Sequence, residues 1–238
     1  MTMNRWALFV DIEGFSKIYP DRMTQALRPL CSLMEGIYYI GSRVCPDTPY
    51  RLFSHQIGDG FIIVSEFAEK SPELPLAIGI FLLRQILVGG GMGKCTISQG
   101  EFSDIKGCFP AIIRSNMDPS GEVRIGGGLM TFFPVMGSAL INCNRLSKLE
   151  SGSLLLLDSD MTQHFPSGVV VSKTASTHYV VDWVHSTTQE INELTAKTGI
   201  AHPAANETEH LIEAYINRNS ADLPPDWRHN TLSLNGCS

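Results

Sequence analysis

Two short segments of this 238-residue chain each carry one aspartate in or beside a run of apolar residues. The first is ALFVDIEGF (7–15), which contains Asp11, and the second is HQIGDGFIIV (55–64), which contains Asp59. An apolar run beside a polar residue and a glycine is typical of a buried strand that meets a tight turn. We therefore expect both carboxylates at strand ends or turns, and close together if the strands are neighbours.

The composition is that of an ordinary globular protein, since 43% of the residues are hydrophobic. A net charge of −6 without any basic run argues against a nucleic-acid binder. No apolar stretch reaches the length of a membrane span, because Arg84 and Gln85 interrupt residues 76–88. The N-terminal MTMNR leads into a strand without the apolar region of a signal peptide. We expect a cytoplasmic protein that does not insert into a membrane.

Hydrophobic periodicity predicts an alternation of strands and helices. Strands or hairpins are expected over 5–10, 51–67, 94–99, 153–157 and 178–184, and helices over 21–42, 73–87 and 138–149. The first helix contains Pro29, so it either begins there or kinks. The helix over 73–87 is expected to be amphipathic. The glycine-rich residues 102–134 show no regular pattern and predict a long, irregular arm.

The last fifty or so residues differ in character from the rest of the chain. Residues 188–197 and 207–218 predict two short helices on either side of Pro203, and the chain from Ala221 onward is expected to be frayed. The simplest division is one domain over 1–186 followed by a helical tail over 187–238.

A third segment, GSALINCNRLSKLESGSLLLLDSD (137–160), predicts a helix that carries Arg145 and then a buried strand. In this order, F-x-D-I-x-G-F, I-G-D-G and the arginine helix resemble the catalytic domain of class III nucleotidyl cyclases, over roughly residues 5 to 185. The resemblance implies an α+β fold, with the ferredoxin-like βαββαβ core of those cyclases followed by the helical tail. It also implies a lyase activity, in which a nucleoside triphosphate is cyclised and pyrophosphate leaves.

The resemblance further implies two divalent metal ions, Mn²⁺ or Mg²⁺, that Asp11 and Asp59 bridge and that the backbone carbonyl of Ile12 helps to hold. Carboxylate and carbonyl oxygens are the ligands that these hard cations prefer. The N–H groups of the turn that follows would then bind the terminal phosphates, and this turn consists of Gly14, Phe15 and Ser16. The alternative is that Asp11 is a helix N-cap and Asp59 a hairpin-turn residue.

Arg145 matches the family's transition-state arginine in the pattern G-x-x-x-N-x-x-x-R, where a guanidinium can hold two α-phosphate oxygens. Counted from Gly137, the asparagine position of that pattern holds Ile141, and Asn142 comes one residue later. A one-residue shift turns a helical side chain by about 100°, so we do not expect Asn142 to replace the asparagine simply. A solvated Arg145 without a catalytic role is the alternative.

At the two positions that contact the base in this family, the chain has neither the residues of adenylate cyclases nor those of guanylate cyclases. Adenylate cyclases of the family have a lysine four residues before the second metal aspartate, paired with an aspartate or threonine ahead of the helix glycine; guanylate cyclases have glutamate and cysteine. Here the two positions hold His55 and Pro134. A site selects strongly only when its polar groups match the substrate, so we predict a pyrimidine triphosphate, UTP or CTP. Tyr50 is expected to stack on or hydrogen-bond to the base across a dimer.

Lacking both sets of residues, the chain looks most like the pyrimidine (uridylate or cytidylate) cyclases of the bacterial Pycsar anti-phage systems. The resemblance implies cyclic UMP or cyclic CMP as a product that a separate effector protein reads, with cyclic UMP favoured. It also implies a homodimer with two shared active sites. Two alternatives stay open: an adenylate or guanylate cyclase with an unusual base pocket, and a catalytically silent nucleotide-binding domain.

Overall fold

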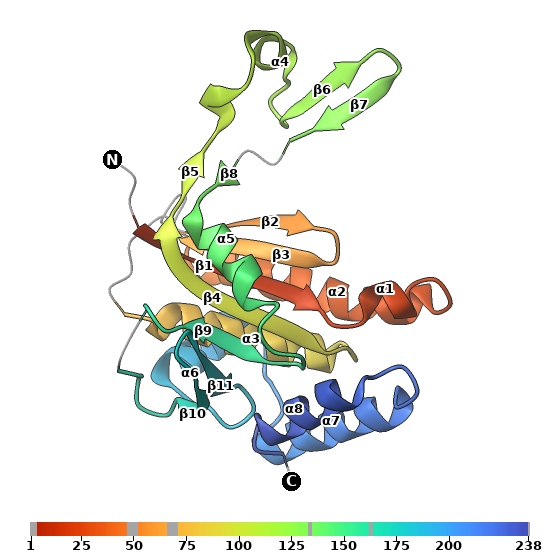
Figure 1. Cartoon of the computed structure of the whole chain (residues 1–238), viewed down its shortest axis with the longest axis vertical. Helices are drawn as coiled ribbons and strands as arrows, with labels where there is room; N and C mark the ends of the chain where they lie inside the picture. Colours follow the sequence, from red (N-terminus) through yellow and green to blue (C-terminus); the bar gives the residue numbers. More distant parts are fainter. Residues whose placement is uncertain (1–3, 47–51, 66–70, 133–134, 162–163, 238) are drawn as a thin grey trace.

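A seven-stranded sheet with the order β10-β11-β9-β4-β1-β3-β2 lies at the centre of the molecule (Figure 1). The computed structural model describes residues 4–46, 52–65, 71–132, 135–161 and 164–237. The strands of this sheet are β1 (Asn4–Ile12), β2 (Leu52–Ile57), β3 (Gly60–Ser65), β4 (Gly93–Glu101), β9 (Leu155–Asp158), β10 (Val170–Thr174) and β11 (His178–Asp182). All neighbours pair antiparallel except β4 and β9, which are parallel.

Strands β1 to β4 form the core that the sequence predicted. They stand in the order β4-β1-β3-β2 and are joined by helices in the sequence βαββαβ, which is the ferredoxin-like arrangement. The helices of the chain are α1 (Phe15–Ile18), α2 (Met23–Tyr39), the π-helical η1 (Ile40–Val44), α3 (Glu73–Val88), the 3₁₀ turn η2 (Lys106–Cys108), α4 (Ala111–Asn116), α5 (Ser138–Leu146), α6 (Gln189–Thr198), α7 (Ala205–Arg218) and α8 (Pro225–Ser233). The prediction of an α+β fold with helical C-terminal elements is confirmed.

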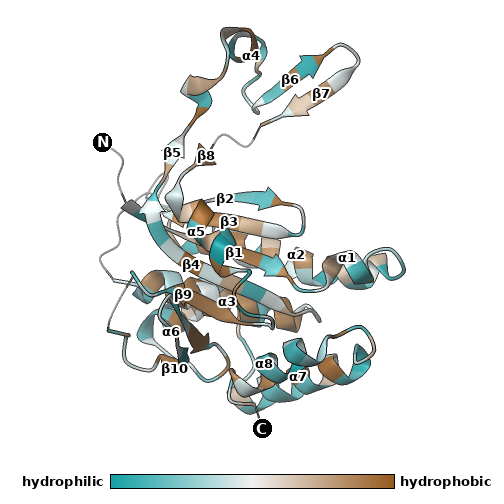
Figure 2. Cartoon of the chain, in the orientation of Figure 1, coloured by the Kyte–Doolittle hydropathy of each residue, from teal (hydrophilic) through white to brown (hydrophobic). Residues whose placement is uncertain are grey.

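Two layers cover the sheet. On one face, α2 and α3 pack with Trp6, Leu8 and Val10 into the main core, and on the other α5 packs over Ala7 and Phe9. Residues that alternate along a strand point to opposite faces, so β1 feeds both cores. Figure 2 shows hydrophobic residues along α3 and more hydrophilic ones on the outer helices α7 and α8.

Helix α2 begins at Met23 and runs through Pro29, so of the two alternatives a helix start at Pro29 is wrong. Pro29 packs against the Gly89–Gly91 turn. Two further predictions about the helices were wrong. Helix α3 is buried on all sides, not amphipathic, because α6 and α7 cover the face that the sheet leaves open. The chain after Ala221 is not frayed: it forms α8, whose Trp227 is 5% exposed.

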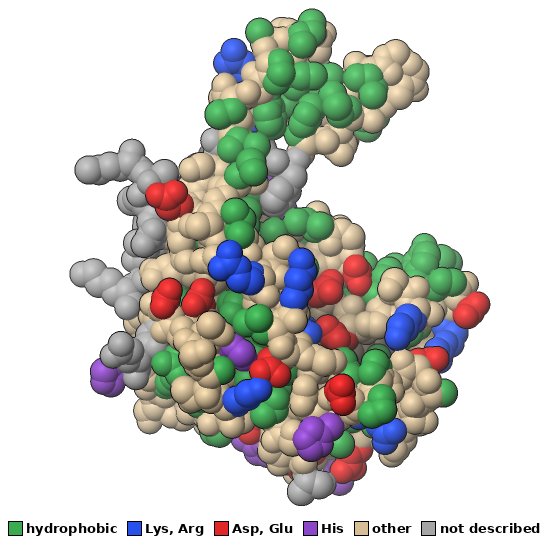
Figure 3. Space-filling model, viewed as in Figure 1, with side chains coloured by type: hydrophobic (Ala, Val, Ile, Leu, Met, Phe, Trp, Pro, Cys, Tyr) green, Lys and Arg blue, Asp and Glu red, His purple; other side chains and the backbone are tan. Residues whose placement is uncertain are grey.

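Residues 102–132 and 135–136 form an arm that projects from the sheet (Figure 1). Strands β5 (Ser103–Asp104) and β8 (Val135–Met136) pair at its base, and β6 (Glu122–Ile125) and β7 (Gly128–Thr131) form a hairpin toward its tip. The arm is therefore more regular than predicted. Figure 3 shows hydrophobic side chains over its surface. The arm residues Ile112, Ile125 and Leu129 are exposed.

Candidate active site

Asp11 lies at the end of β1 and faces the α5 side of the sheet. Val10 and Ile12 belong to the core beneath α2 and α3, whereas Phe9 packs against the cluster beneath α5. The alternation along the strand therefore turns Asp11 in the same direction as Phe9. The Asp11 side chain is half-buried, at a point where the strand runs into the turn before α1. A carboxylate is thus held on a rigid element with its oxygen atoms toward one defined face.

The β2–β3 hairpin brings Asp59 to the same end of β1. Its two-residue turn is Gly58–Asp59, with Gly58 in the left-handed region at φ 61°. Gly60 passes so close to β1 that an added Cβ atom would lie 2.9 Å from Asp11 Oδ1 and 2.9 Å from the Val10 carbonyl oxygen. Glycine at position 60 therefore lets the hairpin turn close over the Asp11 carboxylate.

The two carboxylates interact electrostatically. Burial, followed by the negative charges of Asp59 and Glu13, raises the pKa of Asp11 to about 7, against the lowering effects of the Ile12 N–H group and Lys94. Burial also raises the pKa of Asp59. The site therefore concentrates negative charge that the neighbouring residues do not fully balance. A cation would relieve this repulsion.

These donors fit a divalent cation that shares its ligands with a substrate. Within the described ranges, no group of three or more histidine, cysteine, aspartate or glutamate side chains is arranged to hold a metal ion. Mg²⁺ commonly binds to one or two carboxylates and completes its shell with water and substrate phosphates. Asp11 and Asp59 supply that number of carboxylates, and the backbone carbonyl of Ile12 lies between Asp11 and the following turn.

The turn after β1 has the form expected of a short helix start. Gly14 adopts the left-handed conformation, with φ 74°, and caps the four-residue helix α1. The first intrahelical bonds run from the N–H groups of Lys17 and Ile18 to the Gly14 carbonyl oxygen, each at 3.1 Å. By helix geometry the N–H groups of Phe15 and Ser16 have no acceptor within the helix. Their binding to phosphates stays a prediction.

Lys94 is a neighbour of Asp11 that the sequence motifs did not reveal. The two residues are paired in the antiparallel register of β1 and β4. Lys94 Nζ lies 3.7 Å from Glu13 Oε1 and donates hydrogen bonds to the carbonyl oxygens of Glu150 (2.8 Å) and Ser147 (3.3 Å). The lysine thus connects the loop after Asp11 with the end of the segment that carries Arg145.

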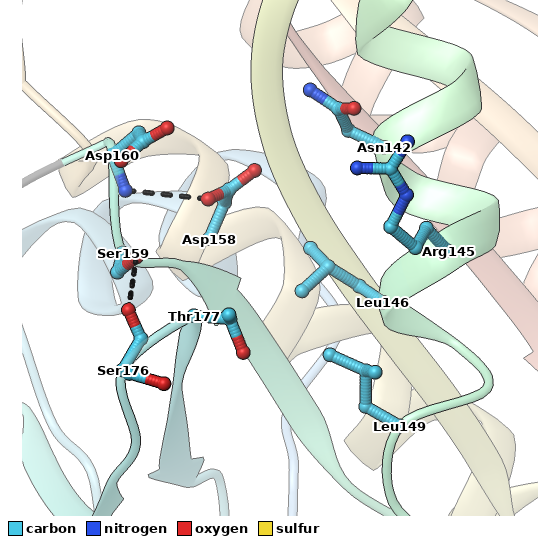
Figure 4. Close-up of a pocket in the computed structure, with 9 residues that line it drawn as sticks. All are labelled: Asn142, Arg145, Leu146, Leu149, Asp158, Ser159, Asp160, Ser176 and Thr177. Carbon is cyan, nitrogen blue, oxygen red and sulfur yellow. Dashed lines mark hydrogen bonds between the residues drawn. The ribbon is translucent and has the colours of Figure 1, made fainter.

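Helix α5 places Arg145 and Asn142 on the same wall of a pocket (Figure 4). The N-cap of α5, Gly137, lies very close to the end of β4, since a Cβ atom at Gly137 would lie 2.0 Å from the Glu101 carbonyl oxygen. Asn142 precedes Arg145 by three positions, and residues three apart on a helix are neighbours. Ile141, at the family's asparagine position, is 57% exposed. The sequence predicted the rotation between Ile141 and Asn142, but it was not foreseen that Asn142 lies beside Arg145 on the same face of the helix.

The opposite wall of the pocket comes from the end of β9 and the β10–β11 turn, and it includes Asp158, Asp160, Ser176 and Thr177 (Figure 4). Asp158 is fixed there, because Ser98 Oγ donates to its Oδ2 at 2.8 Å. An arginine and an amide therefore face carboxylates and hydroxyl groups across an open space. Such a pocket suits a polar ligand.

Of the predicted base-reading residues, the structure describes only His55. It pairs with Ile62, which lies beneath α5, so His55 faces the same side of the sheet as Asp11. Burial and then the charge of Lys106 lower the pKa of His55. The ring is therefore neutral at pH 7, with one nitrogen that donates and one that accepts. Tyr50 and Pro134 lie outside the described residues.

No protein-family model and no curated protein sequence matches the chain. Among solved structures, the chain is similar to the guanylyl cyclase Cya2, with 10% identity, 76% of this chain and 93% of that chain covered, and a TM-score of 0.39. It is also similar to a dimeric guanylyl cyclase domain of the RhoGC fusion protein from the aquatic fungus Blastocladiella emersonii, with 11% identity, 76% and 94% covered, and a TM-score of 0.49.

A third similar structure is a class III adenylyl cyclase-like ATP-binding protein from Pseudomonas aeruginosa, with 11% identity, 81% of this chain and 40% of that chain covered, and a TM-score of 0.49. With identities of 10–11% and TM-scores below 0.5, these similarities carry no argument about this chain, and its chemistry has to be argued from its own side chains. No helix in the part of the chain that the structure describes is long and apolar enough to cross a lipid bilayer.

Proposed function

We propose that this protein is a nucleotidyl cyclase that converts a nucleoside triphosphate, UTP in preference to CTP, into the 3′,5′-cyclic monophosphate and pyrophosphate. The observation that carries the proposal is the convergence of Asp11 and Asp59 at one end of β1, with the pKa of Asp11 raised to about 7. Repelling carboxylates are expensive to maintain in a fold, so their presence at a rigid strand end favours a role in binding cations.

In the reaction, the ribose 3′-oxygen attacks the α-phosphorus, a new O3′–P bond forms, and the bond from that phosphorus to the bridging oxygen of the β-phosphate breaks. The 3′-hydroxyl proton passes to water. Two divalent ions, Mn²⁺ or Mg²⁺, would lower the pKa of the 3′-hydroxyl and neutralise the departing pyrophosphate. Asp11, Asp59 and the Ile12 carbonyl would hold these ions. The N–H groups of Gly14, Phe15 and Ser16 would orient the terminal phosphates for in-line departure.

Arg145 acts where negative charge builds up on the α-phosphate. A guanidinium presents a planar pair of N–H donors that matches two phosphate oxygens. On the family's pattern, Arg145 serves the metal site of the other subunit, which makes the protein a homodimer with two equivalent sites. The α5 pocket, open to solvent and lined by Arg145 and Asn142, supports a role for this surface in binding a polar ligand.

The proposed base specificity depends on His55, Pro134 and Tyr50. A neutral His55 can donate to or accept from a pyrimidine edge. By the resemblance, Pro134 would stand beside the base without adding a polar side chain, and Tyr50 would stack on the small base or hydrogen-bond to it. With this specificity the product would be a second messenger, cyclic UMP in preference to cyclic CMP. As in the anti-phage systems that the sequence resembles, a separate effector protein in the cytoplasm would read it.

The experiment that tests the activity is an incubation of the purified protein with Mn²⁺ and each of ATP, GTP, CTP and UTP separately, followed by mass spectrometry. A cyclic pyrimidine monophosphate is expected, and Asp11→Ala with Asp59→Ala should abolish it without loss of the fold. Cyclic AMP or cyclic GMP would overturn the proposed base specificity but not the chemistry. Full activity in the double variant would contradict the role of the carboxylates.

Shared sites are tested by mixing two inactive variants. If Asp59→Asn and Arg145→Ala each inactivate the homodimer, a heterodimer of the two contains one site with both residues intact. Mixing should therefore restore part of the wild-type activity, whereas each variant alone stays inactive. Activity that is not restored, in mixtures shown to exchange subunits, would mean that each site is complete within one chain.

A further inference from the structure

The C-terminal helices reach back to the loop that follows Asp11. Trp227, on α8, is 5% exposed, and its indole Nε1–H donates a 2.6 Å hydrogen bond to Glu13 Oε2. Glu13 stands two positions after Asp11 and directly before Gly14. A neutral donor bound to a carboxylate makes a strong, charge-assisted hydrogen bond. A residue near the end of the chain thus holds Glu13, at the start of the loop that follows the strand of Asp11.

Glu13 is held on its other side by β4. Its Oε1 atom lies 3.7 Å from Lys94 Nζ, and its backbone N–H donates to the Met92 carbonyl oxygen at 2.8 Å. The Glu13 side chain is only 19% exposed. Its two carboxylate oxygens therefore have one partner each, and loss of either partner leaves a poorly solvated charge that will draw the loop toward water.

Helix α8 also binds the segment after α5. The Ser153 N–H group donates to Thr231 Oγ1 at 2.9 Å, and Asn230 Nδ2 donates to the Ser151 carbonyl oxygen at 2.8 Å. Thr231 is fully buried. One helix is therefore anchored both to the loop of Asp11 and to the turn between the Arg145 helix and β9.

We infer that Trp227 is a positioning residue of the active site, which acts through Glu13 on the backbone of residues 11–16. The inference rests on the proposed function, because it gives that loop its role in binding metal ions and phosphates. A displacement of about 1 Å in groups that orient a reacting phosphate lowers turnover by about 100-fold. The C-terminal helices are then part of the catalytic machinery, in addition to covering α3.

Trp227→Phe is the direct test, because it keeps an aromatic ring in the buried space and removes only the N–H donor. We expect kcat to fall by about 10- to 100-fold and the affinity for Mn²⁺, followed by electron paramagnetic resonance, to weaken, with little change in thermal stability. The side-chain oxygen of Gln in Glu13→Gln can still accept the hydrogen bond from Trp227. This variant should therefore retain a higher kcat and a higher Mn²⁺ affinity than Glu13→Ala. Asp222→Asn is the matched control, since it removes only the charge from the exposed contact of this tail with Arg22.

The outcomes separate this inference from the proposed function. If the wild type makes a cyclic product and neither Trp227→Phe nor Glu13→Ala lowers kcat or Mn²⁺ affinity beyond Asp222→Asn, the tail is only structural. If the wild type makes no product, a weaker Mn²⁺ affinity of Trp227→Phe still supports the inference, and an unchanged affinity overturns it. A wild type that neither turns over nucleotide nor binds Mn²⁺ overturns both. Should Trp227→Phe fail to fold, Glu13→Ala removes the same bond from the loop side.

Discussion

Asp11 and Lys94 lie opposite each other in the register of β1 and β4, so a buried lysine stands beside the carboxylate that we assign to metal binding. Lys94 lowers the pKa of Asp11, but less than burial, Asp59 and Glu13 raise it. The lysine therefore moderates the negative charge of the site without removing it. Its own hydrogen bonds go to the carbonyl oxygens of Ser147 and Glu150.

Lys94→Met should destabilise the protein. The substitution keeps the length of the side chain but leaves two carbonyl oxygens without their donor and Glu13 without its cationic neighbour. We expect a loss of about 2–3 kcal/mol in the free energy of unfolding, since hydrogen bonds to charged groups are each worth about 1.5–3 kcal/mol. Urea denaturation measures it, with Lys148→Met, an exposed lysine after α5, as the control. Equal stability of the two variants would contradict this role of Lys94.

Asp11→Asn should stabilise the metal-free protein above pH 7. The pKa of Asp11 is about 7 in the fold against 3.8 for an aspartate carboxyl in the unfolded chain, so its ionisation reduces stability as the pH rises through this interval. Below pH 4 the carboxyl is neutral in both states and the effect vanishes. Solvent reaches the half-buried group, so we expect about 1–3 kcal/mol at pH 9, less than the roughly 4 kcal/mol of the full shift.

The measurement is urea denaturation of Asp11→Asn and of the wild type at pH 5 and pH 9, in EDTA and in Mn²⁺. In EDTA the variant should gain more stability over the wild type at pH 9 than at pH 5, because at pH 5 only part of the interval between the unfolded and folded pKa values has been crossed. In Mn²⁺ the order should reverse, because the wild type alone binds the ion and is stabilised by it. A variant that is less stable than the wild type in EDTA at pH 9 would show that the Asp11 side chain stabilises the folded protein.

Gly60→Ala should damage the site locally. The new methyl group would meet Asp11 Oδ1 and the Val10 carbonyl oxygen, each at 2.9 Å, so the hairpin turn has to move away from β1. We expect a loss of stability of about 1–3 kcal/mol and a weaker affinity for Mn²⁺. Gly107→Ala is the matched control, because a Cβ atom at Gly107 meets nothing within 4 Å. Unchanged Mn²⁺ affinity in Gly60→Ala would show that the position of the hairpin turn does not affect metal binding.

His185 should make the attachment of α7 depend on pH. Its Nδ1 lies 2.8 Å from Asp182 Oδ2 and its Nε2 lies 3.0 Å from Glu209 Oε1. Burial alone would lower the pKa of His185, but Asp182 and then Glu209 outweigh it and raise the pKa. Burial raises the pKa of Asp182 as well, yet two carboxylates at hydrogen-bond distance favour the charged ring.

A group with a raised pKa stabilises the fold fully below its unfolded value of about 6.5 and loses that contribution as the pH rises through the folded value. His185→Gln should therefore lower the melting temperature more at pH 6 than at pH 9, by a few degrees. His210→Gln, on the exposed face of α7, is the control. An equal loss at both pH values would mean that the ring acts through packing alone.

The sequence placed Asp11 and Asp59 at strand ends or turns, and this placement was predictable because it depends on local pattern: each lies where an apolar strand meets a glycine turn. The ferredoxin-like core was expected from the resemblance to class III nucleotidyl cyclases, and the observed strand order agrees with it. Glu13 and Lys94 were missed for the opposite reason. Their roles come from cross-strand register, and one residue of register decides which face a side chain occupies.

Trp227 was missed because its segment carries no clear period. Helix α8 begins at a proline pair and mixes polar residues around its circumference, so the pattern suggested a frayed end. Its stability comes from tertiary contacts, chiefly the bond to Glu13 across 214 positions and the buried Thr231. Such contacts override weak local helix propensity, and the local sequence does not predict them.

Asn142→Ala should lower turnover, although Asn142 is not at the family's asparagine position. Its side chain shares the α5 pocket with Arg145, whereas Ile141 is exposed away from the core. An amide three positions before the arginine can donate to the same ligand, and loss of one donor at a developing negative charge costs about 100-fold in kcat. Ile141→Ala is the control and should stay within about twofold of the wild type. Ile141→Asn should not raise turnover, because the side chain at position 141 does not line the pocket. A gain of activity in Ile141→Asn would show that the asparagine belongs one position earlier and that Asn142 has no part in the reaction.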